Sequence, residues 1–337
     1  MCLRAAWCSG PPPRISKRSA SASCCIRSSR SSCSVSANSQ PPWTSSRRKS
    51  HTLKPLQRTI QKPVEFTGVG VNVGREVTLR LMPGTPGAGV VFVRADLPGS
   101  PHIAADPQHV VPRLRRTVLR QGEAEVQMTE HVLAAVSGLD IDNLTIEIKG
   151  PELPACDGSA RTFAKLLSDA GIVEQEQPRT CRTVREPVTV ADEGSTLTAL
   201  PGTGGITVSY TLEYPHMSLP SQHFEIRLSP ATFLSELAPA RTFVFQREAP
   251  ALLASGLGRG ASLENTLVLR DDGTPVYGQL RFPDEFARHK VVDLLGDLRL
   301  LGSGLNLRLV AERTGHAQNF QLIAKLRESL VELPPHP

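Results

Sequence analysis

A line of ionisable side chains runs along a segment that is otherwise apolar enough to be buried. The segment 284–302 reads DEFARHKVVDLLGDLRLLG, and its apolar residues recur at the spacing of a helix that faces a core. His289, Asp293 and Asp297 follow one another at four-residue intervals, which places them on one face of that helix. A helix this apolar is not typical of a protein surface. The stripe therefore favours a functional face, although a surface ion pair between His289 and Asp293 is the simpler alternative.

The sign of the net charge differs between the two parts of the chain before and after residue 64. Residues 1–64 hold twelve Lys and Arg and no Asp or Glu, so residues 65–337 hold 26 basic and 32 acidic side chains, a balance of −6. This mildly acidic body does not favour a nucleic-acid-binding face. No stretch of eighteen apolar residues exists, so we expect no membrane span. Only Cys156 and Cys181 lie in the body, which fits a reducing compartment.

The first 50 residues form a low-complexity segment with fifteen Ser and several Arg. Such a composition is typical of disorder, so we expect a disordered basic tail over residues 1–55. An Arg- and Ser-rich, acid-free segment is also typical of an organellar transit peptide. A third interpretation is upstream sequence translated from a wrongly assigned start, with the true start near Leu53 or Leu56.

Strand and helix patterns are mixed in both halves of the body, which predicts an α+β fold. In the first half we expect strands over 77–83, 89–97 and 143–150 and helices over 128–139 and 161–172. In the second half we expect strands over 186–190, 195–202, 206–215, 224–230 and 305–312 and helices over 229–240, 284–302 and around 320–330.

The polar stretch 173–180 reads VEQEQPRT and predicts a linker between two domains. We therefore expect an N-terminal α+β domain over 56–175 and a C-terminal α+β domain over 182–333. The order of elements is similar in the two halves, but no sequence repeat is strong enough to prove a duplication.

Two of the stripe residues have the spacing of a metal site. His289 and Asp293 could hold one ion, because side chains four apart rise from the same helical face, and imidazole with carboxylate suits zinc. Two ligands do not hold a catalytic metal, and His131 is the best candidate for a third. The adjacent Glu130 could contact a water on the metal, or it could simply favour the helix macrodipole from the first turn.

Four segments in order carry a family resemblance: TEHVLAAVSGLDIDNLTIEIKGPELPACDGSA, ARTFVF, DEFARHKVVDLLGDLRLLG and GHAQN. Together they resemble the bacterial UDP-3-O-acyl-N-acetylglucosamine deacetylases, which catalyse the committed step of lipid A biosynthesis. The resemblance covers about residues 58–330. It implies two two-layer α/β sandwich domains packed face to face, with a Zn2+ site between them.

The resemblance also implies roles for individual residues. The zinc ligands fall on His131, His289 and Asp293. Glu130 falls on the general base. The remaining catalytic and substrate positions fall on His316 as general acid or oxyanion stabiliser, Asp297 as the carboxylate that orients it, Thr242 at the oxyanion, and Lys290 and Phe243 in contact with substrate.

The implied substrate is a UDP-linked acylated amino sugar, whose acyl chain needs an apolar groove that the resemblance puts at residues 243–260. One motif departs from the family, which usually reads GVGLHSG. This chain has Asn72 in place of the His and Val73 where a small hydroxyl residue is common.

Three alternatives stay open at this point. A zinc amidase for a different N-acyl sugar would keep the metal site without room for a fatty chain. A non-catalytic RNA-binding module would use the basic tail, but it predicts a basic body. An inactive homologue is expected to have lost one of the five principal site residues, and none is lost. We expect a monomer in the bacterial cytoplasm, or in an organelle if residues 1–50 are a transit peptide.

Overall fold

The computed structural model describes residues 55–215 and 218–334. The expected tail, up to Lys54, lies outside the described residues. Within the described ranges, no helix is both long enough and apolar enough to cross a membrane.

The first half contains a five-stranded sheet with two helices packed on one of its faces. The strand order is β2-β3-β8-β4-β5, with β4 and β8 parallel and the other neighbours antiparallel. In β3 the side chains of Val77, Leu79 and Leu81 point inward and are fully buried, as their alternation predicts. The elements of this half are β2 (Val64–Val69), β3 (Glu76–Pro83), β4 (Val90–Arg94), β5 (His102–Ala104), a hairpin of β6 (Val118–Gln121) and β7 (Ala124–Gln127), α2 (Glu130–Gly138), β8 (Leu144–Lys149) and α3 (Arg161–Asp169).

The second half repeats this architecture with the same strand order and directions. Its sheet runs β11-β12-β17-β13-β14, with β13 and β17 parallel and the other neighbours antiparallel. The elements are β11 (Val188–Asp192), β12 (Ser195–Pro201), β13 (Ile206–Leu212), β14 (Gln222–Arg227), α4 (Pro230–Thr232), β15 (Phe243–Phe245), α5 (Ala249–Ala254), β16 (Leu267–Leu269), α6 (Glu285–Leu298), β17 (Leu307–Glu312) and α7 (His316–Ser329). The predicted α+β fold with two similar sandwich-like halves is confirmed.

The segment 173–180, where a linker between two domains was expected, is largely a strand. Most of it is β9 (Ile172–Pro178), which pairs antiparallel with β1 (Leu56–Ile60) at the start of the body. Most side chains of β9 are exposed, so backbone hydrogen bonds rather than a buried face define this strand, and its sequence lacks the alternation that marks one. A second short pair, β10 (Arg182–Val184) with β18 (Leu330–Glu332), joins the two ends of the second half.

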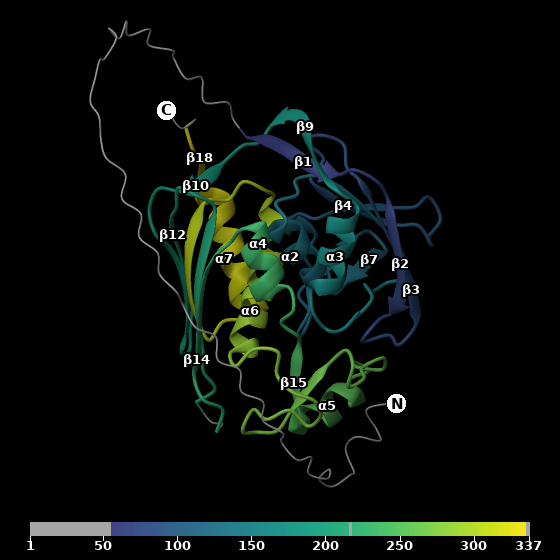
Figure 1. The fold of residues 1–337 in the computed structure, drawn as a ribbon, viewed down its shortest axis with the longest axis vertical. Coiled ribbons are helices and arrows are strands. Elements are labelled where there is room, and N and C mark those ends of the chain that lie inside the picture. Colours follow the sequence, from purple (N-terminus) through teal and green to yellow (C-terminus); the bar gives the residue numbers. More distant parts are fainter. Residues whose placement is uncertain (1–54, 216–217, 335–337) are drawn as a thin grey trace, which may run out of the picture.

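The two halves meet through their helices. Figure 1 shows the two sheets on the outside, with α2, α6 and α7 between them, and β15 and α5 below this helical layer. The contact between α2 and α6 depends on Gly296, because a Cβ atom there would lie 2.1 Å from the carbonyl oxygen of Glu130. The helices therefore approach more closely than any larger residue at position 296 allows.

Replacing Gly296 with Ala tests this contact. In an uncrowded helix this change raises stability by roughly 0.5–1 kcal/mol. Here we expect the free energy of unfolding to fall by about 1–3 kcal/mol, because the new methyl group overpacks the seam between the helices. Chemical denaturation of wild type and variant measures the difference. A variant as stable as wild type, or more stable, would contradict the close contact.

Candidate metal and catalytic centre

Three side chains that suit a metal ion meet at the seam between α2 and α6. His131 is the second residue of α2, and His289 and Asp293 lie one turn apart on α6. One ligand atom from each lies within 4.8 Å of the others, and all three side chains are buried. Nε2 of His131 lies 3.8 Å from Oδ1 of Asp293, and Nε2 of His289 lies 3.5 Å from the same oxygen. The expected third ligand thus comes from the other half of the chain.

The imidazoles in this group are in the state that a metal requires. Nδ1 of His289 lies 3.1 Å from the carbonyl oxygen of Ala240, which can only accept, so Nδ1 carries the proton and the lone pair of Nε2 faces Asp293. Burial, with a contribution from His289, lowers the pKa of His131 to about 3. Burial also lowers the pKa of His289. Neutral imidazoles beside a carboxylate are the donors that suit zinc.

Asp293 stays ionised although it is buried. Burial alone would raise its pKa, but neighbouring positive charge, that of the Lys290 ammonium among it, lowers the pKa below the ordinary value. The ammonium of Lys290 donates to Oδ2 of Asp293 over 3.1 Å. The other carboxylate oxygen, Oδ1, is the one that faces the two histidines.

Glu130 lies beside the group in a buried position. Burial raises its pKa to about 8, and the carboxylate of Asp293 adds to this shift. The backbone N–H of Thr117 donates to Oε2 of Glu130 over 3.1 Å and fixes the orientation of the carboxyl group. A carboxyl group with a pKa near neutrality is suited to general acid–base work.

His316 opens α7 and is held by Asp297, the last residue of the stripe. Nδ1 of His316 lies 2.6 Å from Oδ2 of Asp297, which is fully buried. Burial alone would lower the pKa of His316, but the Asp297 carboxylate raises it to about 9. Asp297 also accepts from the hydroxyl of Thr117 over 2.5 Å and from Nδ2 of Asn319 over 2.8 Å. The imidazolium of His316 is therefore stabilised at neutral pH.

These groups line a catalytic cleft of about 350 Å³. Among the predicted site residues, the cleft is lined by Glu130, His131, Thr242, Phe243, Lys290, Asp293 and His316. His289 and Asp297 lie behind this surface and contact the lining residues. The ring of Phe243 lies 5.7 Å from the Lys290 ammonium and 4.9 Å from the ring of Phe286. The fold thus brings all nine predicted residues to one place.

A mainly apolar pocket of about 110 Å³ adjoins the cleft and shares with it Leu114, Arg115, Met128, Thr242 and Phe243. Most of its other walls come from the insert, which we define as residues 243–269. The segment 243–260, where the groove was expected, contributes Phe243, Val244, Ala249, Leu252, Leu253, Leu257 and Gly258.

Asn72 lines the same apolar pocket. Its side-chain amide donates to the buried Glu152 over 2.9 Å, and its Oδ1 accepts from the backbone N–H of Gly258 over 3.3 Å. The neighbouring N–H of Val73 also donates to Glu152. The departure from the usual motif therefore places an amide, not an imidazole, where the first half meets the insert.

Two buried residues of the centre were missed from the sequence. Asn319 lies in the GHAQN segment, three residues after His316 on the same helix, so its spacing was a usable signal. Thr117 lies just before β6, in a stretch without a recognisable motif. It joins the two sides of the centre, because its N–H contacts Glu130 and its hydroxyl contacts Asp297.

Comparisons with known proteins agree on one family. The family model described as UDP-3-O-acyl N-acetylglycosamine deacetylase matches residues 57–328. A protein of Anaeromyxobacter dehalogenans named UDP-3-O-acyl-N-acetylglucosamine deacetylase is 42% identical over 270 residues, which is 80% of this chain and 87% of the relative. Proteins of the same name from Myxococcus xanthus and Chlamydia abortus are 40% and 37% identical over 80% and 82% of this chain, and over 86% and 99% of their own lengths.

The hydroxyl of Thr117 can be tested apart from any reaction. Thr117→Val keeps the shape but leaves a buried carboxylate oxygen of Asp297 without its donor. We expect the free energy of unfolding to fall by about 1.5–3 kcal/mol, the usual cost of losing a hydrogen bond to a charged group. Thr117→Ser keeps the hydroxyl and is the matched control, for which we expect a smaller loss in denaturant unfolding. Equal losses in both variants would remove the hydrogen bond as the cause.

Proposed function

The chain belongs to the UDP-3-O-acyl N-acetylglycosamine deacetylase family, and we propose that it hydrolyses the N-acetyl group of a UDP-linked 3-O-acyl-N-acetylglucosamine. The products are acetate and the free amino sugar, and the reaction is the committed step of lipid A biosynthesis. The observation that carries this proposal is one cleft lined by Glu130, His131, Asp293 and His316, with His289 behind its wall completing a His–His–Asp donor group.

We propose zinc as the resident metal. The donor set fits it, because two neutral imidazoles and one carboxylate offer three ligand atoms close enough to share an ion. Three protein ligands leave one position open, which is typical of a catalytic zinc site. A bound zinc ion would supply Lewis acidity to a water molecule and to the amide carbonyl. The residues that would hold it are His131, His289 and Asp293.

Glu130 and His316 divide the proton transfers in this proposal. Glu130 accepts the proton of the attacking water, and the N–H of Thr117 holds its carboxyl group toward the cleft. His316, kept as an imidazolium by Asp297, donates a proton to the nitrogen of the leaving amine. The hydroxyl of Thr242 lies on the cleft wall and supports the developing oxyanion.

The cleft and its neighbouring pocket support the substrate class. Lys290 and Phe243 lie side by side on the cleft wall and offer one cation and one aromatic face to the sugar and its phosphates. The adjoining apolar pocket of the insert is open to an acyl chain on the 3-position. This pocket favours the acylated substrate over a different N-acyl sugar, because an amidase for an unacylated sugar has no use for it.

The proposed reaction is tested directly by incubating purified protein with the UDP-linked acylated sugar and measuring release of acetate. We expect hydrolysis that stops when a chelator removes the metal and returns when Zn2+ is added. Parallel incubation with UDP-N-acetylglucosamine, which lacks the acyl chain, separates the two amidase hypotheses. Equal rates on both substrates would refute the role of the apolar pocket.

Four further proposals complete this assignment. These are the domain limits at 56–175 and 182–333, a monomeric state, action in the bacterial cytoplasm, and no binding of nucleic acid.

Two substitutions in α2 separate metal binding from proton transfer. His131→Ala removes a ligand, so metal content and turnover should fall together. Glu130→Gln keeps size and polarity but cannot accept a proton, so it should retain about one zinc per chain and lose turnover by roughly 10²–10⁴. Metal analysis and kcat on both variants check this division of roles.

The matched control is Glu328→Gln, the same change at an exposed position near the end of α7. It should leave both metal content and kcat unchanged. Full activity in Glu130→Gln would exclude Glu130 from the mechanism, and only a small loss of stability would then be expected from its position in the first helical turn.

A further inference from the structure

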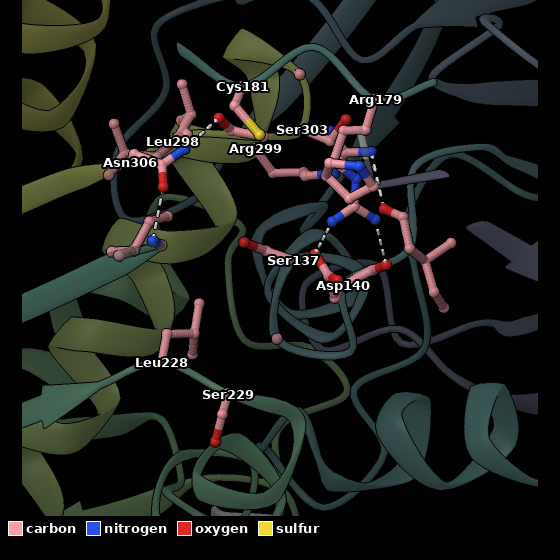
Figure 2. Close-up of a pocket in the computed structure, with 18 of the residues that line it drawn as sticks. Ser137, Asp140, Arg179, Cys181, Leu228, Ser229, Leu298, Arg299, Ser303 and Asn306 are labelled. Atoms are coloured by element: carbon pink, nitrogen blue, oxygen red, sulfur yellow. Dashed lines mark hydrogen bonds and ion pairs between the residues drawn. The ribbon is translucent and has the colours of Figure 1, made fainter. Parts of the chain in front are cut away.

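A second cavity lies between the two halves and shares no lining residue with the catalytic cleft. It has a volume of about 330 Å³ and lies where α2 and α6 end. The first half contributes Ser137 and Asp140, and the second half contributes Cys181, Arg299 and Ser303. Figure 2 shows Arg179 and Arg299 close together on one side of this cavity, with Cys181 and Ser303 beside them. The volume is in the range of small-molecule sites rather than of a single trapped water.

Two arginines in the wall of this cavity are more than nine-tenths buried. Arg179 is 8% exposed and Arg299 is 4% exposed. Arg179 is paired with Asp140 and Asp142, whereas Nη2 of Arg299 donates only to the carbonyl oxygens of Ile141 and Asp142. Within the described ranges, Nε of each arginine lacks a hydrogen-bond partner. Arg299 is thus a buried cation without a carboxylate of its own among those residues.

The local charges leave a positive excess. Four arginines, Arg58, Arg179, Arg182 and Arg299, lie near three carboxylates, Asp140, Asp142 and the exposed Glu332, an excess of one charge. Arg182 donates to the carbonyl oxygens of Leu301 and Ser303 rather than to a carboxylate. The carboxyl-terminal ends of α2 and α6 offset part of this excess through their dipoles, but Arg299 still has no carboxylate partner among the described residues. Buried cations without counterions are costly, so an anion in the cavity would be stabilising.

Burial shifts the pKa values of two of these arginines. It lowers the pKa of Arg299 to about 10, and although Asp142 opposes this change, Arg179 and Arg182 add to it. Burial also lowers the pKa of Arg182.

We propose that this cavity binds a small molecule bearing an oxyanion, a phosphate or a carboxylate, between Arg179 and Arg299. Guanidinium groups suit both anions because their planar N–H groups match pairs of oxygens. The ligand contacts α2 and α6 at the ends away from Glu130 and His289, and it links the two halves of the chain. This site is separate from the catalytic one and does not depend on the reaction proposed above.

Cys181 provides a probe at the site itself. It lines the cavity and is a free, partly buried thiol, whereas Cys156, the other described cysteine, lies outside it. The full chain is treated with iodoacetamide, an uncharged reagent, in inorganic phosphate, in citrate, or in chloride at matched ionic strength. The alkylation rate of each cysteine peptide is followed by mass spectrometry. We expect phosphate or citrate at twice its dissociation constant to slow alkylation of Cys181 by about threefold, saturably, and to leave Cys156 unaffected.

Matched variants identify the arginine. Arg299→Met removes the charge and keeps much of the volume, so Cys181 should lose its protection by the oxyanions. Arg327→Met makes the same change at an exposed position on α7 and should behave as wild type. Should Arg299→Met not fold, Ser137→Leu fills the cavity without touching an arginine and should likewise remove the dependence on phosphate or citrate.

Protection of Cys181 that persists in Arg299→Met, or in Ser137→Leu where Arg299→Met does not fold, would place the anion elsewhere and overturn the proposal. The absence of any oxyanion effect in wild type beyond that of chloride would overturn it too. Phosphate could also bind in the catalytic cleft and raise the thermal stability of the chain from there. The deciding measurement is therefore the alkylation rate of Cys181.

Discussion

The close packing of α2 against α6 is the constraint on which the rest of the centre depends. Gly296 has no side chain, so the backbone of α2 can lie directly against it. A Cβ atom at this position would lie only 2.1 Å from the carbonyl oxygen of Glu130. At this crossing, His131 of α2 comes within reach of Asp293 on α6. The two halves also touch through Thr117 with Asp297 and through Asn72 with Gly258, but the donor group itself is assembled at this crossing. Tight helix packing is therefore part of the chemistry and not only of the stability.

Burial shifts the pKa values of adjacent groups in this centre in opposite directions. It keeps the imidazole of His131 neutral and brings the pKa of Glu130 to about 8, while the Asp297 carboxylate overrides burial at His316 and raises its pKa to about 9. Burial thus decides the direction of the pKa shift at Glu130, whereas a neighbouring carboxylate decides it at His316. Thr117 contacts both sides of this arrangement and links the carboxyl group of Glu130 to that of Asp297.

The sequence predicted the parts of this centre that depend on local spacing. The four-residue intervals of His289, Asp293 and Asp297 required one helical face, and the structure has them on one. That His131 reaches this face could not be derived from spacing, because it depends on how two separate halves pack. The residues alone made His131 a candidate third ligand, and the family resemblance implied the same role. Thr117 acts through its backbone N–H as much as through its side chain, and a backbone group cannot be recognised from the residue type. The sequence therefore gave no sign of its role. The sequence of residues 173–180 did not predict the strand β9, because hydrogen bonds to β1, not burial of alternate side chains, hold this strand in place.

The repeated topology explains where the specific chemistry arises. Each half has four strands, an insertion, a helix, a fifth strand and a second helix, and the fifth strand lies parallel to the third in both. The insertions fall at the same point in each half but differ. In the first half it is the hairpin β6–β7, immediately preceded by Thr117, and in the second it is the insert that starts at Phe243.

The shared scaffold brings the first helices of the two halves, α2 and α6, together and so accounts for the donor group. The unlike insertions supply the residue that joins Glu130 to Asp297 and the walls of the apolar pocket. The repeated architecture thus positions the metal ligands, whereas the differences between its two copies determine what can bind beside them.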